Sequence, residues 1–264
     1  EELSARSSES FTVIFSTNES SPQGISTGIV LNIDSENSFS RTDTIHFTIG
    51  ESEVIFTDNF EQGLDHWILD DNWGLSNEAN QGQYSLSDSP GTEYAPNQVS
   101  IAEINREFNL LFYSDPQVKF KLKWDIEPNY DFVRFQGYIP EEGWVSLEGR
   151  FTSNGSGNPA QPVGESGYDG LQETWVEEVI YLNQVSQANF ERFRFIQTSD
   201  QFVEGAGFFI DDIMITGYPQ GQLGDFNLDD KVDIFDLLLL SDLLLFGSAP
   251  NTIQLFYCDL DGNG

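Results

Sequence analysis

The chain has 264 residues, of which 11 are Lys or Arg and 44 are Asp or Glu, so its formal net charge is -33 at pH 7. This charge excludes nucleic acid and anionic membranes as favourable partners and suits divalent cations. Aromatic residues form 14% of the chain, which excludes a disordered acidic tail. The single cysteine, Cys258, excludes an intrachain disulfide. Adaptation to high salt is an alternative cause of the acidic composition.

Residues 1–52 alternate polar and apolar side chains as β-strands do. The segments SFTVIFST, GISTGIVLNIDS and TDTIHFTIGE predict three strands, with turn residues between the first two. Three strands seldom form a stable sheet alone. The segment resembles the final strands of an Ig-like β-sandwich of secreted bacterial proteins. That resemblance implies that upstream sequence or another molecule completes the sandwich.

Residues 53–217 predict an all-β sandwich, because short strands and Gly, Asn and Asp turns follow one another with almost no helical periodicity. Its markers include VIFTDNFEQGLDHW, NWGL, VKFKLKWDIEPNYDFVRFQGYI, WVSLEG, ERFRFIQTSD and GAGFFIDDIMITG. In order and spacing these markers resemble the MAM-like jelly roll that follows secreted peptidases of the immune-inhibitor-A group. The resemblance implies a jelly-roll fold in an accessory module.

The same resemblance implies a calcium ion where the first and last strands of the sandwich meet. By motif, the Phe-Glu of the first strand and the Ile-Asp-Asp of the last fall there. We expect Asp58, Glu61 and Asp211 or Asp212 as ligands, with Asp88 as a further candidate. One ion clamping carboxylates from distant strands would tie the sandwich shut. The alternative is a set of acidic turn residues that face water.

Six of the 11 basic residues alternate with apolar residues along three predicted strands, which places them on polar strand faces. If these strands lie in one sheet, the six side chains form a single basic patch. Such a patch would dock an acidic partner, either a neighbouring copy of this chain or an anionic glycan. The alternative is the ordinary polar face of half-buried strands. The six residues are Lys119, Lys121, Lys123, Arg134, Arg192 and Arg194.

Catalytic motifs are absent from the sequence, so we expect no enzyme activity in this chain. The two histidines are His46, which alternates outward on a predicted strand, and His66, which lies in a turn-like segment. No HExxH, GxSxG or phosphate-loop pattern occurs. A carbohydrate-binding module would need an aromatic platform. Trp124 alternates toward the core, and Trp67 and Trp73 fall in predicted loops, so the tryptophans form no obvious platform.

After a linker at 218–223, the segment GDFNLDDKVDIFDLLLLSDLLL predicts a calcium loop that runs directly into an apolar helix. Oxygen-bearing side chains occupy loop positions 1, 3, 5, 9 and 12, and Lys231 at position 7 offers its backbone carbonyl. This is the EF-hand ligand spacing. The loop departs from that pattern with Asp230 in place of Gly and with Asp at position 12. The oxygen ligands are Asp225, Asn227, Asp229, Asp233 and Asp236.

The Val-Asp pair, the Asp at position 12 and the Asp-Leu-Leu helix start resemble a dockerin type I repeat. A second, truncated repeat begins at Cys258 as CDLDGNG, with ligand positions at Asp259, Asp261 and Asn263. The resemblance assigns residues 224–264 to a dockerin-like unit. It implies calcium as cofactor and a cohesin-type partner, contacted by loop positions 10 and 11, Ile234 and Phe235.

The helix predicted between Leu237 and Phe246 is apolar on nearly all sides. About ten residues cannot span a bilayer, which needs ~20. A helix of this kind in water must be covered on most sides, and the sequence implies that a partner covers it.

Together these segments predict a jelly-roll β-sandwich with an N-terminal Ig-like strand set and a C-terminal EF-hand-like loop-helix unit. The predicted function is a non-catalytic, calcium-binding adhesion or assembly segment of an extracellular or surface-attached protein. One alternative is a subunit of a calcium-stabilised fibre or layer assembled head to tail. A further alternative is a carbohydrate-binding accessory module of a secreted peptidase.

Overall fold

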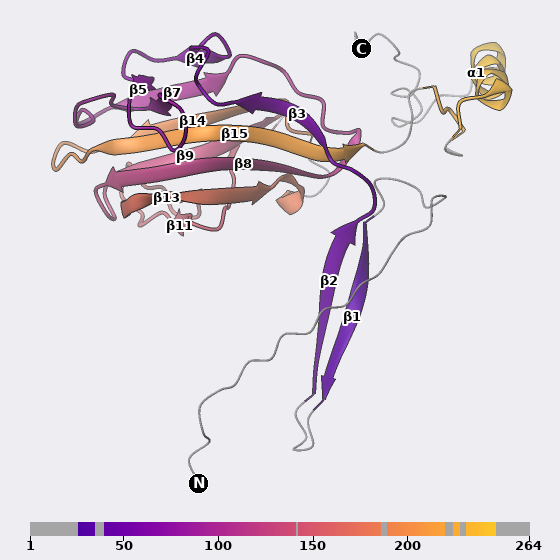
Figure 1. Ribbon diagram of the computed structural model, residues 1–264, viewed down its shortest axis with the longest axis horizontal. Helices are drawn as coiled ribbons and strands as arrows, with labels where there is room; N and C mark the ends of the chain where they lie inside the picture. Colours follow the sequence, from indigo (N-terminus) through magenta and orange to yellow (C-terminus); the bar gives the residue numbers. More distant parts are fainter. Residues whose placement is uncertain are drawn as a thin grey trace.

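A computed structural model describes residues 26–34, 40–140, 142–185, 189–219, 224–227 and 231–246. These residues form a two-stranded hairpin, a β-sandwich and a C-terminal helix (Figure 1). The elements are β1 (Ser26–Asp34), β2 (Ser40–Thr48), β3 (Glu53–Asp58), β4 (Trp67–Leu69), β5 (Gly74–Ser76), β6 (Ser85–Ser87), β7 (Val99–Ile104), β8 (Tyr113–Ile126), β9 (Phe132–Ile139), β10 (Gly143–Ser146), β11 (Ser153–Asn154), β12 (Ser166–Gly167), β13 (Gly170–Tyr181), the 3₁₀ turn η1 (Leu182–Gln184), β14 (Arg192–Thr198), β15 (Gly207–Pro219) and α1 (Ile234–Phe246).

The hairpin pairs β1 with β2 in antiparallel register, from Ser26 opposite Thr48 to Asp34 opposite Ser40. It projects from one end of the sandwich (Figure 1). At its base the Thr48 hydroxyl donates a hydrogen bond to the carboxylate of Asp115 at the start of β8. The first strand predicted from the sequence, SFTVIFST, lies outside the described residues.

The sandwich consists of two antiparallel sheets. The six-stranded sheet has the order β13-β8-β15-β6-β5, and β3 also pairs with β15. The five-stranded sheet has the order β10-β9-β14-β7-β4. The prediction of an all-β jelly-roll sandwich with a short C-terminal helix is confirmed.

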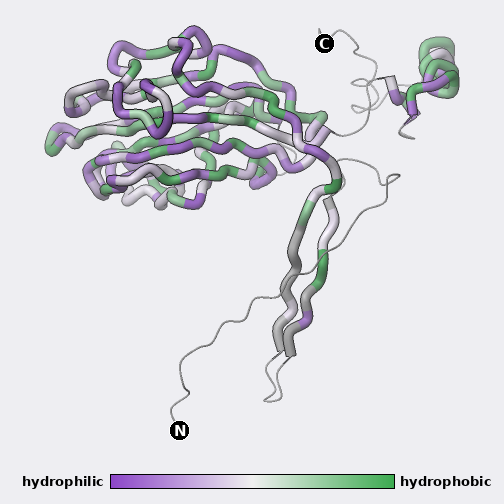
Figure 2. The backbone as a smooth tube through the Cα atoms, viewed as in Figure 1, coloured by the Kyte–Doolittle hydropathy of each residue, from purple (hydrophilic) through white to green (hydrophobic). Residues whose placement is uncertain are grey.

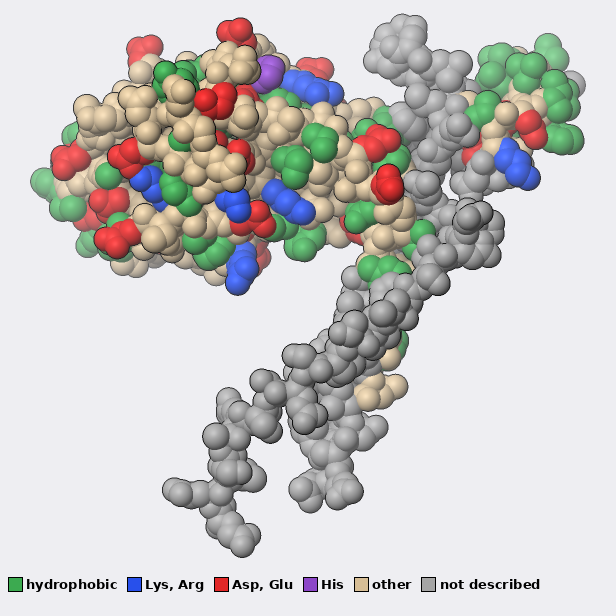
Figure 3. All heavy atoms as spheres, in the orientation of Figure 1, with side chains coloured by type: hydrophobic (Ala, Val, Ile, Leu, Met, Phe, Trp, Pro, Cys, Tyr) green, Lys and Arg blue, Asp and Glu red, His purple; other side chains and the backbone are tan. Residues whose placement is uncertain are grey.

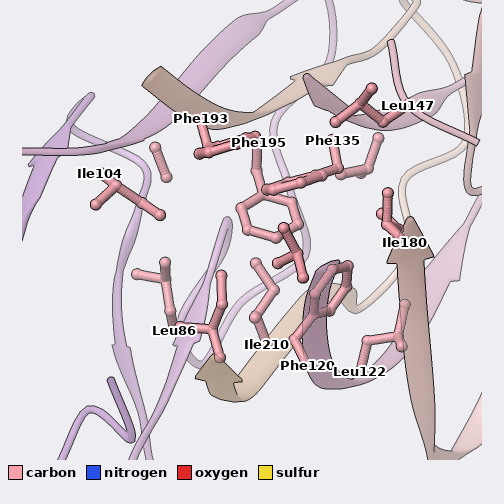
Figure 4. Packing of buried hydrophobic residues seen from close by; sticks show 14 of the residues in the cluster. Leu86, Ile104, Phe120, Leu122, Phe135, Leu147, Ile180, Phe193, Phe195 and Ile210 are labelled. Atoms are coloured by element: carbon pink, nitrogen blue, oxygen red, sulfur yellow. The ribbon is translucent and has the colours of Figure 1, made fainter. Parts of the chain in front are cut away.

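The core lies between the inner faces of the two sheets. In Figure 4, Phe135 and Phe195 from the five-stranded sheet face Phe120 and Ile210 from the six-stranded sheet. The Phe120 ring centroid lies 5.6 Å from that of Phe135 and 5.3 Å from that of Phe195. Each fully buried aromatic or aliphatic side chain stabilises the fold by about 1.5–3 kcal/mol relative to exposure. The predicted alternation of β8 is confirmed, because Val118, Phe120, Leu122 and Trp124 are all buried.

Two tryptophans that the sequence placed in loops belong to this core. Trp67 opens β4, and both Trp67 and Trp73 are buried, with ring centroids 6.4 Å from that of Phe195. The loop prediction was therefore wrong for Trp67. Short strands such as β4, with three residues, give too little alternation to be recognised.

The helix α1 begins at Ile234, one turn before the predicted start, and has 13 residues. Figure 2 shows that it is hydrophobic along most of its length. Among the residues that the structure describes, no helix is both long enough and apolar enough to cross a membrane.

Candidate calcium and partner-binding sites

Asp236, at position 12, closes the C-terminal loop. Its Oδ1 accepts hydrogen bonds from the backbone N–H groups of Phe226 at 2.7 Å and Asn227 at 3.0 Å. Its Oδ2 accepts a hydrogen bond from the backbone N–H of Asp233 at 2.7 Å. Because the three donors occupy loop positions 2, 3 and 9, one carboxylate holds the start of the loop against the start of the helix.

The same two aspartates cap α1. Asp233 Oδ1 accepts the backbone N–H of Phe235 at 2.8 Å, while Asp236 accepts the N–H of Asp233. This reciprocal arrangement is a capping box, which explains why the helix begins at Ile234. The backbone N–H groups, that of Asp233 foremost, hold the pKa of Asp236 below its ordinary value. Asp236 therefore stays ionised at neutral and mildly acidic pH.

The donor set of this loop fits calcium. Asp225 and Asp236 are 1% and 4% exposed, so two carboxylates are buried in one short loop. Burying like charges is costly unless a cation compensates them, and oxygen ligands suit Ca²⁺. Five predicted ligands lie in the described ranges, namely Asp225, Asn227, Lys231, Asp233 and Asp236; Asp229, Asp259, Asp261 and Asn263 lie outside them.

Large apolar side chains are exposed over the start and the end of α1. Ile234 is 58% exposed and Phe235 is 61% exposed, at the two positions predicted to contact a partner. Leu237 and Leu238, one turn further on, are also more than half exposed, as is Leu244 near the end of the helix. Several large exposed apolar side chains on one short helix are typical of a site that another molecule covers.

Three of the predicted carboxylates, one after β3 and two inside β15, hold one loop, residues 80–84. Asp211 Oδ2 accepts two backbone N–H groups, those of Asn80 at 2.8 Å and of the next residue at 3.2 Å. Asp212 Oδ2 accepts the side-chain amide of Asn80 at 3.0 Å. Glu61 Oε1 accepts two backbone N–H groups from the end of the loop at 2.7 and 2.8 Å. The structure thus gathers Glu61, Asp211 and Asp212 around the same loop.

Asp58 makes other contacts, at the end of β3. Its Oδ1 accepts the backbone N–H of Phe60 at 2.8 Å. Its Oδ2 accepts the indole N–H of Trp67 at 3.0 Å and lies 3.1 Å from Nδ1 of His66. Asp58 therefore ties β3 to the start of β4, and among the described residues it makes no hydrogen bond to the loop at 80–84.

Asp88, which follows β6, is fully buried in the sandwich. Its Oδ1 accepts the backbone N–H of Phe208 and the hydroxyl of Ser89, both at 2.9 Å. Its Oδ2 has no hydrogen-bond partner among the described residues. Burial raises the pKa of Asp88 to about 7.

A further acidic cluster was not predicted from the sequence. Glu127, Asp131 and Asp200 each place a carboxylate oxygen within 4.8 Å of the others. The Tyr94 hydroxyl donates to Asp131 at 2.7 Å. Burial raises the pKa of both Glu127 and Asp131, and the neighbouring carboxylates add to this. Glu127 and Asp131 share the loop between β8 and β9, whereas Asp200 follows β14, so no local pattern joins all three residues.

The prediction of one basic patch is wrong. The lysines lie on β8 in the six-stranded sheet, whereas the arginines lie on β9 and β14 in the five-stranded sheet. Since both sets face outward, a sandwich places them on opposite sides. Lys121 pairs with Glu177 at 2.9 Å, and Lys123 pairs with Glu78. On the face that Figure 3 shows, basic side chains are scattered among acidic ones.

The arginines form a compact group with two aromatic rings on the outer face of the five-stranded sheet. The group consists of Arg134, Arg192, Arg194, Tyr138 and Trp144, and we call it the arginine face. Trp144 pairs with Tyr138 across β10 and β9, and Tyr138 pairs with Arg192 across β9 and β14. The guanidinium carbon of Arg194 lies 4.0 Å from the Trp144 ring centroid, and that of Arg192 lies 4.5 Å from the Tyr138 centroid.

The aromatic pair of this face was missed from the sequence. Trp144 follows Gly143 in a four-residue strand, β10, whose direction relative to the core cannot be read from its own alternation. Tyr138, however, lies two residues from Gln136 and four from Arg134 on one strand, a spacing that places all three on one face. That spacing was the available signal.

Comparison with known families gives a match for the C-terminal segment. Residues 223–264 match the family described as dockerin type I domain. Dockerin type I domains are non-catalytic, bind calcium through EF-hand-like loops and dock to cohesin domains of multidomain extracellular proteins. No curated protein matches the chain.

Solved structures similar to this chain include carbohydrate-binding modules and adhesin domains. A xylan-binding CBM22-1 domain of Xyn10C from Paenibacillus barcinonensis shares 11% identity over 64% of this chain and 97% of that chain, with a TM-score of 0.39. A family 22 module of Xyn10B from Clostridium thermocellum shares 14% identity over 62% and 94%, with a TM-score of 0.36. The K3 cleaved adhesin domain of Lys-gingipain from Porphyromonas gingivalis shares 15% identity over 62% and 100%, with a TM-score of 0.42.

Proposed function

We propose that this chain is a non-catalytic segment of an extracellular or surface-attached protein, in which residues 224–264 dock to a cohesin-type partner when calcium is bound. The observation that carries the proposal is that the predicted calcium loop and an exposed apolar helix start are adjacent. The loop closed by Asp236 ends directly in a helix start where Ile234 and Phe235 are exposed. Metal binding and partner contact therefore share one short segment.

Calcium would act on this segment through the loop. Asp236 already orders the backbone at loop positions 2, 3 and 9, so the carboxylates of Asp225 and Asp233 are held close to the helix start. A bound ion would neutralise these charges and fix the helix relative to the loop. The apolar side chains of α1 would then be presented in one arrangement, which reduces the entropy cost of docking.

A paired substitution tests the docking. We expect I234D/F235D to abolish binding to a panel of cohesin domains, because two apolar side chains that the partner would bury become charged. Calcium uptake, measured by calorimetry, should survive. The control is V163D, since Val163 is an apolar residue of the sandwich that is even more exposed than Ile234 and Phe235. Cohesin binding that persists in I234D/F235D would show that the assigned contact is wrong.

A second calcium ion is proposed beside the loop of residues 80–84. Glu61, which follows β3, and Asp211 and Asp212, which lie in β15, all bond to this loop, and this convergence supports the proposal. Asp211 is fully buried, and burial raises its pKa, so a cation there would stabilise its charged form. Calcium titration should show one fewer calcium site in E61Q/D212N than in the parent chain. An unchanged number of sites would refute this assignment.

A second candidate function is carbohydrate binding by the sandwich. It is favoured by the half-buried pair of Tyr138 and Trp144 on an outer sheet face, with ring centroids 5.4 Å apart. Aromatic rings bind the apolar faces of sugars, and here they lie among hydrogen-bonding side chains. W144A should remove retention by an immobilised polysaccharide, whereas W175A, on the other sheet, should not. Equal retention of all variants would count against this function.

Assembly into a fibre or layer is the remaining proposal. The exposed helix and the projecting hairpin are both surfaces that a neighbouring copy could cover. Sedimentation of the chain in calcium, and again after chelation, distinguishes such an assembly from a monomer. Calcium-dependent polymers would support assembly, and a persistent monomer in both conditions would exclude it.

A further inference from the structure

We infer that the arginine face binds glycans that carry carboxylate groups, such as uronic acids. This inference rests on the candidate carbohydrate-binding function and specifies its ligand class. It is argued from the position of three arginines beside two aromatic rings on one outer sheet face.

The register of the five-stranded sheet builds this face in rows. Trp144, Tyr138 and Arg192 lie opposite one another across β10, β9 and β14. Gln136 and Arg194 follow in the next row. The inward-facing residues of the same strands, such as Phe135, Phe193 and Phe195, belong to the core. The face is thus fixed by a rigid sheet and does not depend on loops.

Hydrogen bonds hold the side chains of this face in place. Arg194 Nε donates to Gln136 Oε1 at 2.9 Å, and Gln136 Nε2 donates to the Ser146 hydroxyl at 3.1 Å. The Arg194 guanidinium also stacks against Trp144, and Arg192 lies over Tyr138. These contacts use the Nε of Arg194 and the faces of the two rings. Within the described ranges the terminal N–H groups of Arg194 have no hydrogen-bond partner, so they can bind a ligand.

The arginines outnumber the carboxylates that pair with them. Arg192 pairs with Glu103 at 3.0 Å and Arg134 with Glu165 at 3.7 Å. Arg194 has no carboxylate within 4.0 Å among the residues that the structure describes. Burial lowers the pKa of Arg194. The carboxylate of Glu103, which lies opposite Arg194 across β14 and β7, raises this pKa, and the repulsion from Arg134 and Arg192 lowers it. An anion bound beside Arg194 would relieve this repulsion.

The arginine face differs in charge from the rest of the molecule. The net charge is -33, and the lysines of β8 are interspersed with acidic partners. A positively charged group on such a chain attracts an anion only at close range, because the overall field repels it. Specific contacts must therefore supply the affinity. An Arg guanidinium binds a carboxylate through two parallel hydrogen bonds.

The aromatic rings favour a sugar over an acidic peptide or a second copy of this chain. A pyranose ring can pack against the edges of Trp144 and Tyr138, because the guanidinium groups lie over the ring faces, while its carboxylate reaches the guanidinium of Arg194. An acidic peptide would use the arginines but would gain little from the rings. The face therefore matches a ligand in which an apolar ring surface and a carboxylate occur in one unit.

The test compares one sugar with and without its charge. The full chain is titrated by calorimetry with a galacturonate oligosaccharide, with its methyl ester, and with neutral xylo- and manno-oligosaccharides. The parent chain is compared with R194Q, which loses the unpaired charge, and with K121Q on the opposite sheet as the matched control. Thermal melting of each variant checks that the fold is retained, and repetition at higher NaCl probes the charge without any substitution.

We expect the galacturonate to bind, its affinity to fall with added salt and to fall roughly tenfold or more in R194Q. K121Q should bind as the parent does. Equal affinity for the acid and its ester would overturn the inference and leave neutral carbohydrate binding in place. Binding to none of the sugars would overturn both. Self-association that R194Q removes, without sugar binding, would assign the face to contact between copies instead.

Discussion

In the sandwich, Phe135, Phe193 and Phe195 are fully buried, whereas in α1 Ile234 and Phe235 are more than half exposed. The sandwich finds partners for its apolar side chains within its own two sheets. The helix, which is more apolar along its length, finds few in the described part of the chain. The first region buries its apolar side chains within itself, whereas under the proposed function the second is completed by an ion and a partner.

The surroundings of buried carboxylates also differ between the two regions. Asp88 in the sandwich is fully buried, which disfavours its charged form, and one of its oxygens has no hydrogen-bond partner in the described part of the chain. Asp236 in the loop is buried with three backbone N–H donors, so its charged form is favoured. Burial alone does not predict charge, because the donors around each carboxylate decide it.

Removing one core ring should give the largest effect on stability. F195A deletes a fully buried ring that packs against rings from both sheets, so it should lower the free energy of unfolding by about 3 to 5 kcal/mol. Urea denaturation followed by tryptophan fluorescence measures this. The matched control, L244A on the exposed side of α1, should change it by less than about 0.5 kcal/mol. A comparable loss in both variants would mean that α1 is packed in the free chain.

The pH dependence of the sandwich should reveal Asp88. Its folded pKa of about 7 lies above the unfolded value of 3.8, so the folded state binds its proton more tightly. Its contribution to stability therefore decreases as pH rises from about 4 to about 7, by a few kcal/mol. D88N should lack this decrease when urea denaturation is compared at pH 4.5 and 7.5. A pH profile identical to that of the parent would show that Asp88 is ionised throughout.

The loop should respond to pH in the opposite direction. The folded pKa of Asp236 is depressed, so its contribution is present above its ordinary pKa and is lost only as pH falls below that value. D236A should remove the helix cap and calcium uptake together, while the sandwich keeps its fold. Circular dichroism with and without calcium measures the helix. Calcium-induced helix in D236A equal to that of the parent would contradict the role given to this carboxylate.

The smallest effect on stability is expected when a charged residue replaces an exposed apolar residue of α1. L244D should leave the unfolding of the free chain unchanged, since the Leu244 side chain is 77% exposed. It should increase solubility at high concentration, because an apolar surface is interrupted. Light scattering at increasing protein concentration checks this, and a destabilised L244D would show that the side chain is covered.

The sequence predicted what depends on local spacing. Alternation along β8 showed which side chains are buried, and the positions of Asp225, Asn227, Asp233 and Asp236 predicted the calcium loop. The capping box was also readable, since Asp233 and Asp236 are three residues apart.

What could not be predicted depends on which strands lie in one sheet. Alternation gives the face of a strand but not its neighbours, so lysines and arginines of opposite sheets were grouped together. For the same reason the contact between Arg194 and Trp144 was missed, because it joins residues 50 positions apart. The cluster of Glu127, Asp131 and Asp200 likewise needs the tertiary structure.

The most direct test of the account is a native mass spectrum of the full chain mixed with cohesin domains, recorded in calcium and again after chelation. We predict a calcium-loaded complex with one cohesin that separates into its components when calcium is removed, because the loop and the exposed start of α1 act together. A chain that binds no calcium, or a complex that persists after chelation, would contradict the account.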